Sequence, residues 1–104
     1  MDNQLKRGLL DYCILKAALK EETYGYRIIK DIKPYINIKE STLYPILRRL
    51  EAHGFLNVRS EEHNGRIRKY YRITDEGRKR LIKFRDEWEE LNRIYKYLRG
   101  DEFD

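Results

Sequence analysis

Two short segments of the chain carry side chains that could bind a polyanion. The first, STLYPILRRLE at residues 41–51, places hydroxyl groups, a proline and two adjacent arginines within about three helical turns. The second, RIRKYYR at residues 66–72, has four cations and no acid. Guanidinium and ammonium groups bind phosphate oxygens, and hydroxyl groups and helix N-termini add hydrogen bonds. These residue types at this density favour contact with nucleic acid.

The first segment divides into two faces when it is placed on a helix at about 100° per residue. One face is apolar and consists of Leu43, Ile46, Leu47 and Leu50; the other is slim and polar and consists of Ser41, Tyr44, Pro45, Arg48 and Ala52, with Arg49 on the flank. We expect a helix over 40–53, closed by Gly54, whose outer face enters a DNA major groove N-terminus first. Pro45 predicts local distortion around Ser41 and Thr42. Taken alone, the pattern also fits an ordinary surface helix whose arginines are solvated.

The second segment belongs to a predicted β-hairpin. Apolar or aromatic residues alternate with polar ones near the start of the run 56–73 and again near its end, and Asn64-Gly65 lies between. Alternating strands on either side of Asn-Gly are a strong hairpin signal. A cation-rich hairpin commonly follows DNA phosphates or enters the minor groove, which makes this one a candidate wing. The alternative is a sheet face that is simply basic.

Helices must position these two segments. Apolar residues recur at intervals of three and four over 5–20, which predicts a first, central helix. Thr23 offers a cap for a second helix that Pro34 ends, and Ile36 and Ile38 indicate one brief extended segment. We expect these two helices to pack with the helix that carries the arginines.

A last helix is expected to begin at Thr74, its predicted cap, and to run for about 25 residues. Apolar residues step by three and four along it, at Leu81, Phe84, Trp88, Leu91, Tyr95 and Leu98. Such a seam favours a partner helix. The order predicts a mainly α fold with a small β-hairpin, a winged helix-turn-helix plus a long C-terminal dimerisation helix. We expect the DNA-binding domain over 1–74, with its first helix also in dimerisation, the dimerisation helix over 75–99 and an acidic tail over 100–104.

Composition narrows the class of protein. The chain has 104 residues and a formal net charge of +5, which suit one small domain with a polyanionic partner. A single cysteine, Cys13, allows no intrachain disulfide, and no apolar run is long enough to span a membrane, so we expect a cytoplasmic protein. His53 and His63 pair with no cysteine at metal-ligand spacing, and no catalytic set occurs. We expect no enzyme activity, no metal and no cofactor.

The sequence resembles the PadR family of bacterial and archaeal transcriptional regulators. The matching stretches are YGYRI at 24–28, STLYPILRRLEAHGFL at 41–56, RKYYRITDEGRKRL at 68–81 and the tryptophan at 88. The resemblance implies a homodimer, built through the first and last helices, that binds a palindromic operator in double-stranded DNA and usually represses transcription. It also implies the shorter branch of the family, with one C-terminal helix. The alternative is a winged-helix adaptor that binds protein and not DNA, because the fold serves both uses.

The expected DNA contacts follow from the two basic segments together with this resemblance. They are Tyr26, Lys39, Ser41, Thr42, Tyr44 and Arg48 from the helices, and Arg66, Arg68 and Lys69 from the wing. Tyr26 could instead pack beneath the third helix, and Tyr70 and Tyr71 are expected to shape the sheet. Many family members have Ser or Asn about where Lys39 stands; lysine accepts no capping bond, so the hydroxyl of Ser41 or Thr42 is the expected cap.

Trp88, in the middle of the seam, has two interpretations. It either anchors the dimer interface or stacks on a flat aromatic compound between the subunits, as similarity to short family members implies. Leu9, Tyr12 and Cys13 on the first helix and Asn92 on the last helix would line that space. A small aromatic effector that releases the regulator from DNA is therefore a second expected partner.

Overall fold

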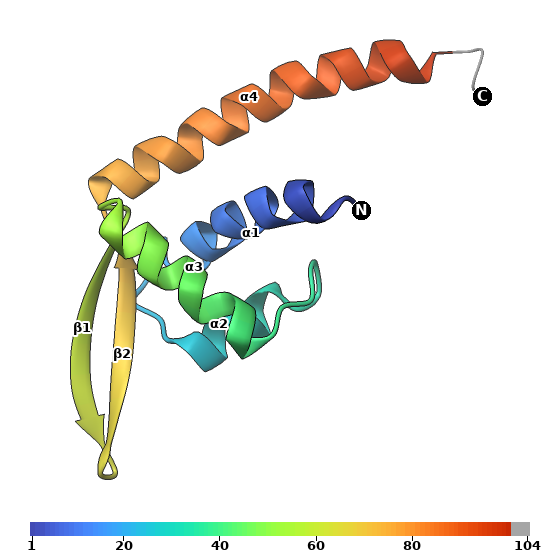
Figure 1. The fold of residues 1–104 in the computed structure, drawn as a ribbon. Helices are drawn as coiled ribbons and strands as arrows, with labels where there is room; N and C mark the ends of the chain where they lie inside the picture. Colours follow the sequence, from blue (N-terminus) through green and yellow to red (C-terminus); the bar gives the residue numbers. More distant parts are fainter. Residues whose placement is uncertain (101–104) are drawn as a thin grey trace.

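The computed structural model describes residues 1–100, and residues 101–104 of the predicted acidic tail lie outside the described part. The elements are α1 (Asn3–Ala17), α2 (Gly25–Ile32), α3 (Glu40–Ala52), β1 (Leu56–His63), β2 (Arg66–Ile73) and α4 (Asp75–Arg99). Three short helices pack together, the β1–β2 hairpin projects from them, and α4 extends past α1 (Figure 1). This arrangement confirms the predicted fold class, a winged helix-turn-helix followed by one long helix, and we call the hairpin the wing.

The core lies where the three short helices meet the base of the wing. All four residues of the apolar stripe of α3 are buried, and they pack with Ile14, Leu15 and Ile28 of the first two helices. Tyr71 and Ile73 at the end of β2 close this core from the side of the wing. Burial of one stripe leaves the opposite face of α3 exposed, as the helical wheel predicted.

The start of α3 has no side-chain cap. The N-cap residue is Lys39, and no hydroxyl group forms the expected capping hydrogen bond. Instead, the N–H groups of Thr42 and Leu43 both donate to the Lys39 carbonyl, each at 3.0 Å. The helix runs through Pro45 without a break, so the expected distortion is limited to this tight first turn. At the other end Gly54 adopts a φ of 79°, a left-handed conformation that glycine takes without strain.

Two expectations about the second helix are wrong. Tyr24 is the N-cap of α2, while Thr23 exchanges backbone hydrogen bonds of 2.9 and 2.8 Å with Tyr71 and so lies along the free edge of β2. No strand forms at 35–38: a turn over 33–35 follows α2, residues 36–39 are irregular, and Ile36 and Ile38 pack against the core. The local sequence predicted Thr23 as the cap of α2, but the backbone of Thr23 pairs with a distant strand instead.

The wing is a regular antiparallel hairpin. Eight residue pairs run from Leu56 opposite Ile73 to His63 opposite Arg66. Asn64 and Gly65 have φ values of 51° and 78°, so both central turn residues are left-handed, as the predicted Asn-Gly turn requires.

One threonine joins the wing to α4. The Thr74 hydroxyl accepts a 3.0 Å hydrogen bond from the Gly77 N–H and donates one of 2.6 Å to the Gly54 carbonyl. The Thr74 N–H donates to the Phe55 carbonyl at 3.1 Å. The predicted cap of the last helix is thus confirmed, and it also ties the helix to the end of α3.

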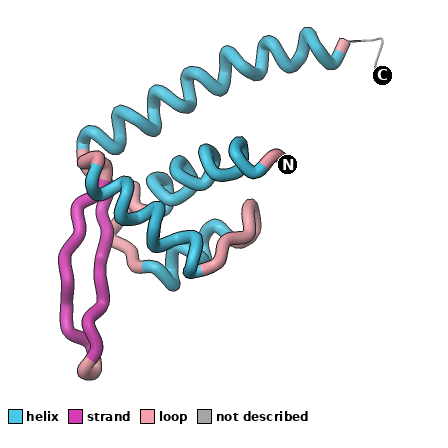
Figure 2. The backbone as a smooth tube through the Cα atoms, in the orientation of Figure 1, coloured by secondary structure: helices cyan, strands magenta, loops and turns pink. Residues whose placement is uncertain are grey.

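Beyond its first turns α4 leaves the rest of the chain, and it diverges from the direction of the wing (Figure 2). Leu81 is buried, whereas Trp88, Leu91, Tyr95 and Leu98 are about half exposed. The predicted seam is therefore an apolar stripe along α4, and the rest of the described chain buries only the N-terminal part of this stripe. Among residues 1–100, no helix combines the length and the apolar character needed to cross a lipid bilayer.

Candidate nucleic-acid interface

An open groove of about 970 Å³ lies between the wing and the N-terminal parts of α2 and α3. We call it the wing groove. Six of the nine expected DNA contacts line it: Tyr26, Tyr44, Arg48, Arg66, Arg68 and Lys69. The other three, Lys39, Ser41 and Thr42, are exposed at the start of α3 outside this lining. Two segments separated by about twenty residues in the chain thus share one surface.

The cations of the wing groove have no acidic partner in the part of the chain that the structure describes. Within residues 1–100, no ion pair involves Arg48, Arg66, Arg68 or Lys69. By contrast Arg27, Arg49 and Arg59, which lie outside the groove, all bind carboxylates. The groove therefore carries positive charge that the described part of the chain leaves uncompensated.

A close contact between α2 and α3 orients Tyr44. A Cβ atom added at Gly25 would lie 2.7 Å from the Tyr44 hydroxyl oxygen, so in its present position the Tyr44 ring leans on the backbone of α2 where glycine leaves space. Tyr44 remains 40% exposed, and Tyr26 is 69% exposed. The alternative that Tyr26 packs beneath α3 is therefore wrong.

One face of the wing carries a stack of aromatic rings and guanidinium groups that sequence reasoning missed. The Arg68 guanidinium lies 4.3 Å from the centre of the Tyr24 ring, and the Arg59 guanidinium lies 4.5 Å from that of Tyr70. The two rings meet edge to face at 5.9 Å. Each cation faces the negative surface of a ring, which holds both side chains in place.

Arg59 also binds two carboxylates. It donates to Glu22 through Nε at 2.7 Å and Nη2 at 2.5 Å, and to Glu61 through Nη1 at 2.6 Å. The hydrogen bond from Arg59 lowers the pKa of Glu22, and the same contacts raise the pKa of Arg59. No local motif connects Glu22 with Arg59, because the two are 37 positions apart.

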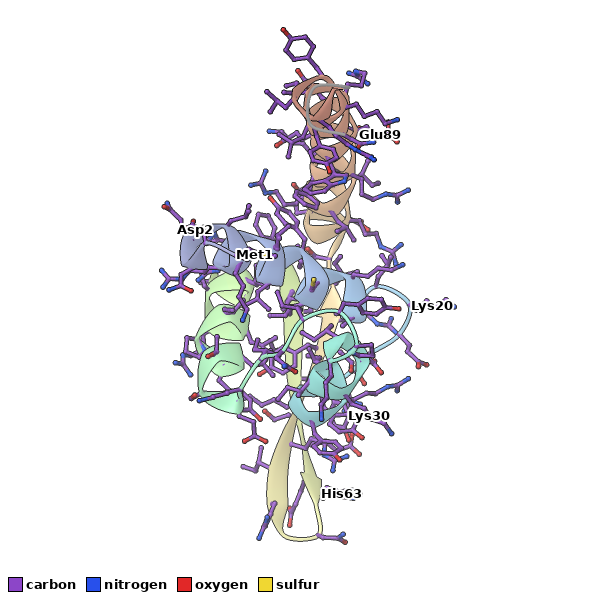
Figure 3. The ribbon with its side chains drawn as sticks, turned by 90° about the vertical axis from the view of Figure 1, so that its right-hand side faces the viewer. Met1, Asp2, Lys20, Lys30, His63 and Glu89 are labelled. Atoms are coloured by element: carbon purple, nitrogen blue, oxygen red, sulfur yellow. The ribbon has the colours of Figure 1, made fainter. Side chains whose placement is uncertain are left out.

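The residues expected to bind an aromatic ligand lie elsewhere, and only in part together. The rings of Tyr12 and Phe84 stack with their centres 3.8 Å apart, and the centres of the Phe84 and Trp88 rings are 6.1 Å apart. Leu9 and Trp88 line a shallow groove of about 360 Å³ between α1 and α4, and Asn92 lines the next groove along α4, again with Trp88. Figure 3 shows Glu89, which lines the same groove as Trp88, in the upper part of the molecule on α4, far from His63 near the tip of the wing.

Cys13 does not face Trp88. It lines a separate cavity between α1 and α2, together with Lys16, Thr23, Arg27 and other residues. Burial raises the pKa of the Cys13 thiol, which keeps it protonated at neutral pH. The periodicity of α1 did not reveal which of its faces each residue would present to α4.

No cluster of three potential metal ligands occurs in the part of the chain that the structure describes. His53 ends α3, and His63 ends β1.

Comparison with known proteins identifies the family. The model of the transcriptional regulator PadR-like family matches residues 14–83. The transcriptional regulator Rv3488 of Mycobacterium tuberculosis is 34% identical over 91 residues, which cover 86% of this chain and 85% of the relative. The crystal structure of a PadR family regulator from Eggerthella lenta has a TM-score of 0.85 at 35% identity, covering 94% of this chain and 88% of that one.

A further solved structure contains nucleic acid. It is PadR of Bacillus subtilis in complex with operator DNA, with a TM-score of 0.68 and 31% identity over 73% of this chain and 46% of that longer chain. The match over residues 14–83 includes α2, α3 and the whole wing. On this evidence the chain belongs to the PadR-like family of transcriptional regulators.

Proposed function

We propose that this regulator works in the cytoplasm as a homodimeric repressor that binds a palindromic DNA operator, with residues 1–74 as the DNA-binding unit. The observation that carries the proposal is the wing groove, where the outer face of α3 and the cations of the wing meet without an acidic partner among residues 1–100. The complex of Bacillus subtilis PadR with operator DNA supports the same use of the fold.

The geometry suits entry of α3 into the major groove. The leading part of its outer face carries Ser41, Thr42 and Tyr44, which are exposed and carry hydroxyl groups for base edges or phosphates. No side chain caps the start of α3, which leaves first-turn N–H groups for a phosphate. Arg48, one turn after Tyr44, would reach the flanking phosphate backbone. The wing cations would follow the neighbouring backbone or enter the minor groove.

DNA affinity measured as a function of salt tests the proposal. We expect a steep loss of affinity with salt, with a slope of about −0.9 per phosphate contact. Arg68→Ala should weaken binding to selected operator and random DNA alike, whereas Tyr44→Ala should mainly reduce the preference for operator. Lys96→Ala is the matched control, because it removes one charge from the far end of α4. Equal loss on both DNAs for both groove variants would contradict this division, and salt-independent or absent binding would overturn the proposal.

The seam of α4 supports pairing of two copies. Trp88, Leu91, Tyr95 and Leu98 form a stripe at intervals of three and four, and their exposed fractions of 47–60% leave an apolar face without cover in this chain. A second α4 would bury it and present two copies of α3 about 34 Å apart, one turn of DNA.

Light scattering tests the pairing. Leu91→Glu should give single chains, whereas Tyr97→Glu, on an exposed face away from the seam, should not. A wild-type chain that scatters as a monomer at working concentrations would refute the homodimer.

Repression and its release are the remaining parts of the proposal. Transcription in vitro from a promoter that overlaps the selected operator should fall as protein is added, and a rise would overturn the repressor assignment. A flat aromatic effector would bind at Trp88, whose groove of about 360 Å³ has the size of a small-ligand site. Planar aromatic compounds should quench Trp88 fluorescence saturably, and the absence of quenching across a broad panel would leave Trp88 with a structural role only.

A further inference from the structure

Arg59 is a cation of the wing that does not line the wing groove. Its guanidinium is held in place by the Tyr70 ring, by two hydrogen bonds to Glu22 and by one to Glu61. We call Arg59, Glu22 and Glu61 the acid clamp. The three hydrogen bonds and the stacked ring together hold in one position a guanidinium whose side chain is about half exposed.

The strand register brings the acid clamp close to Arg68, a cation of the wing groove. Glu61 on β1 lies directly opposite Arg68 on β2. Residues opposite each other in an antiparallel pair have Cβ atoms about 4.5–5.5 Å apart, so opposite charges there normally attract. Yet Glu61 binds Arg59, two positions away on its own strand, and Arg68 stacks on Tyr24 without an ion pair among residues 1–100.

We propose that Arg59 is a positioning residue for DNA binding: by occupying Glu22 and Glu61 it keeps Arg68 unpaired and available to a phosphate. This inference rests on the proposed function. Without Arg59, the Glu61 carboxylate would lose its partner and would pair with Arg68, which lies opposite it on the same face of the hairpin. The effect requires no contact between Arg59 and DNA.

The expected effects are moderate because all these side chains are partly exposed. Arg59→Met, which keeps an unbranched apolar stem and removes the charge and the donors, should weaken DNA binding about fivefold for each subunit, near the upper end for exposed ion pairs. The slope of affinity against salt should also fall by about one phosphate contact per subunit. Circular dichroism should show an unchanged fold, because no core residue is altered.

A second substitution separates this mechanism from a general effect of charge. Adding Glu61→Gln to Arg59→Met should restore most of the affinity, since a neutral amide in place of this carboxylate cannot form an ion pair with Arg68. Glu62→Gln is the matched control: it removes the same charge from the neighbouring position, which lies opposite Ile67 on the other face of the hairpin. Glu62→Gln should restore little. In an otherwise wild-type chain, Glu61→Gln should change affinity less than it does beside Arg59→Met.

The outcomes are distinct. If wild-type protein binds DNA but Glu61→Gln and Glu62→Gln rescue Arg59→Met equally, or neither rescues it, the inference is overturned and Arg59 acts through its own charge. If Arg59→Met still weakens binding about fivefold in an Arg68→Ala chain, the inference is likewise overturned, because Arg68 is then not the residue affected. Loss of salt-dependent DNA binding by wild-type protein would instead refute the proposed function.

Discussion

The contact between α4 and the end of α3 can be tested at Gly77. Its backbone is helical, so alanine would meet no strain of its own. A Cβ atom at this position, however, would lie 2.3 Å from the Phe55 carbonyl oxygen and 2.7 Å from Cγ1 of Ile73. Ordinary contacts begin at about 3.5 Å, so α4 and Phe55 would have to separate by about 1 Å.

The structure sets the size of the effect. The Phe55 carbonyl accepts the Thr74 N–H, so it cannot turn away without loss of a hydrogen bond at the start of α4. Overpacking of a fixed site costs about 1–3 kcal/mol, and we expect Gly77→Ala to destabilise the fold by about 3 kcal/mol. The higher helix propensity of alanine relative to glycine offsets less than about 1 kcal/mol of this cost.

Urea unfolding at one protein concentration measures the difference. Gly8→Ala is the matched control, because Gly8 is exposed within α1 and a Cβ atom there would meet nothing within 4 Å. It should raise the free energy of unfolding by up to about 1 kcal/mol. A Gly77→Ala protein as stable as the Gly8→Ala protein would refute the reasoning.

Three further predictions concern single side chains. Thr74→Val removes the cap of α4 and should lower the free energy of unfolding by about 1 kcal/mol, measured by urea titration; no change would mean that the cap is not needed. Arg59 lowers the pKa of Glu22 in the folded chain, so this pair stabilises the fold above the ordinary glutamate pKa and the benefit is lost as pH falls through the folded-state value. The melting temperatures of wild type and Glu22→Gln should therefore differ more at pH 7 than at pH 3, and an equal difference would contradict the pair. Burial raises the pKa of Cys13, so iodoacetamide should react more slowly with the folded chain than with the chain in urea at pH 8; equal rates would show an open thiol.

The sequence predicted correctly those features that depend only on residues close together in the chain. The Asn64-Gly65 turn and the apolar stripe of α3 both formed as expected, because a left-handed turn and a period of 3.6 depend on neighbouring residues only. Thr23 failed as a cap because its backbone pairs with Tyr71, 48 positions later (71 − 23). No pattern around Thr23 could reveal that partner.

The sequence predicted which residue types form the candidate site, but it could not predict which arginines are paired with acids. Basic and hydroxyl side chains on the third helix and the wing pointed to one surface, and six of the expected contacts line the wing groove. The acids that surround Arg59 could not be assigned from sequence, since Glu22 comes from the loop before α2 and Glu61 from β1. The face of Cys13 was equally undetermined, because α1 is apolar on more than one side.

The Thr74 junction has a mechanical consequence for operator choice. With 25 residues, α4 is an arm about 37 Å long, and it starts at a threonine bonded to the end of α3 and to its own first turn. A tilt of about 10° at this joint would move the tip of the arm by about 6 Å, more than the rise of one base pair, about 3.4 Å. In the proposed homodimer, stiffness at Thr74 would set how strictly the two chains measure the distance between half-sites, and a loosened joint would accept operators of altered spacing.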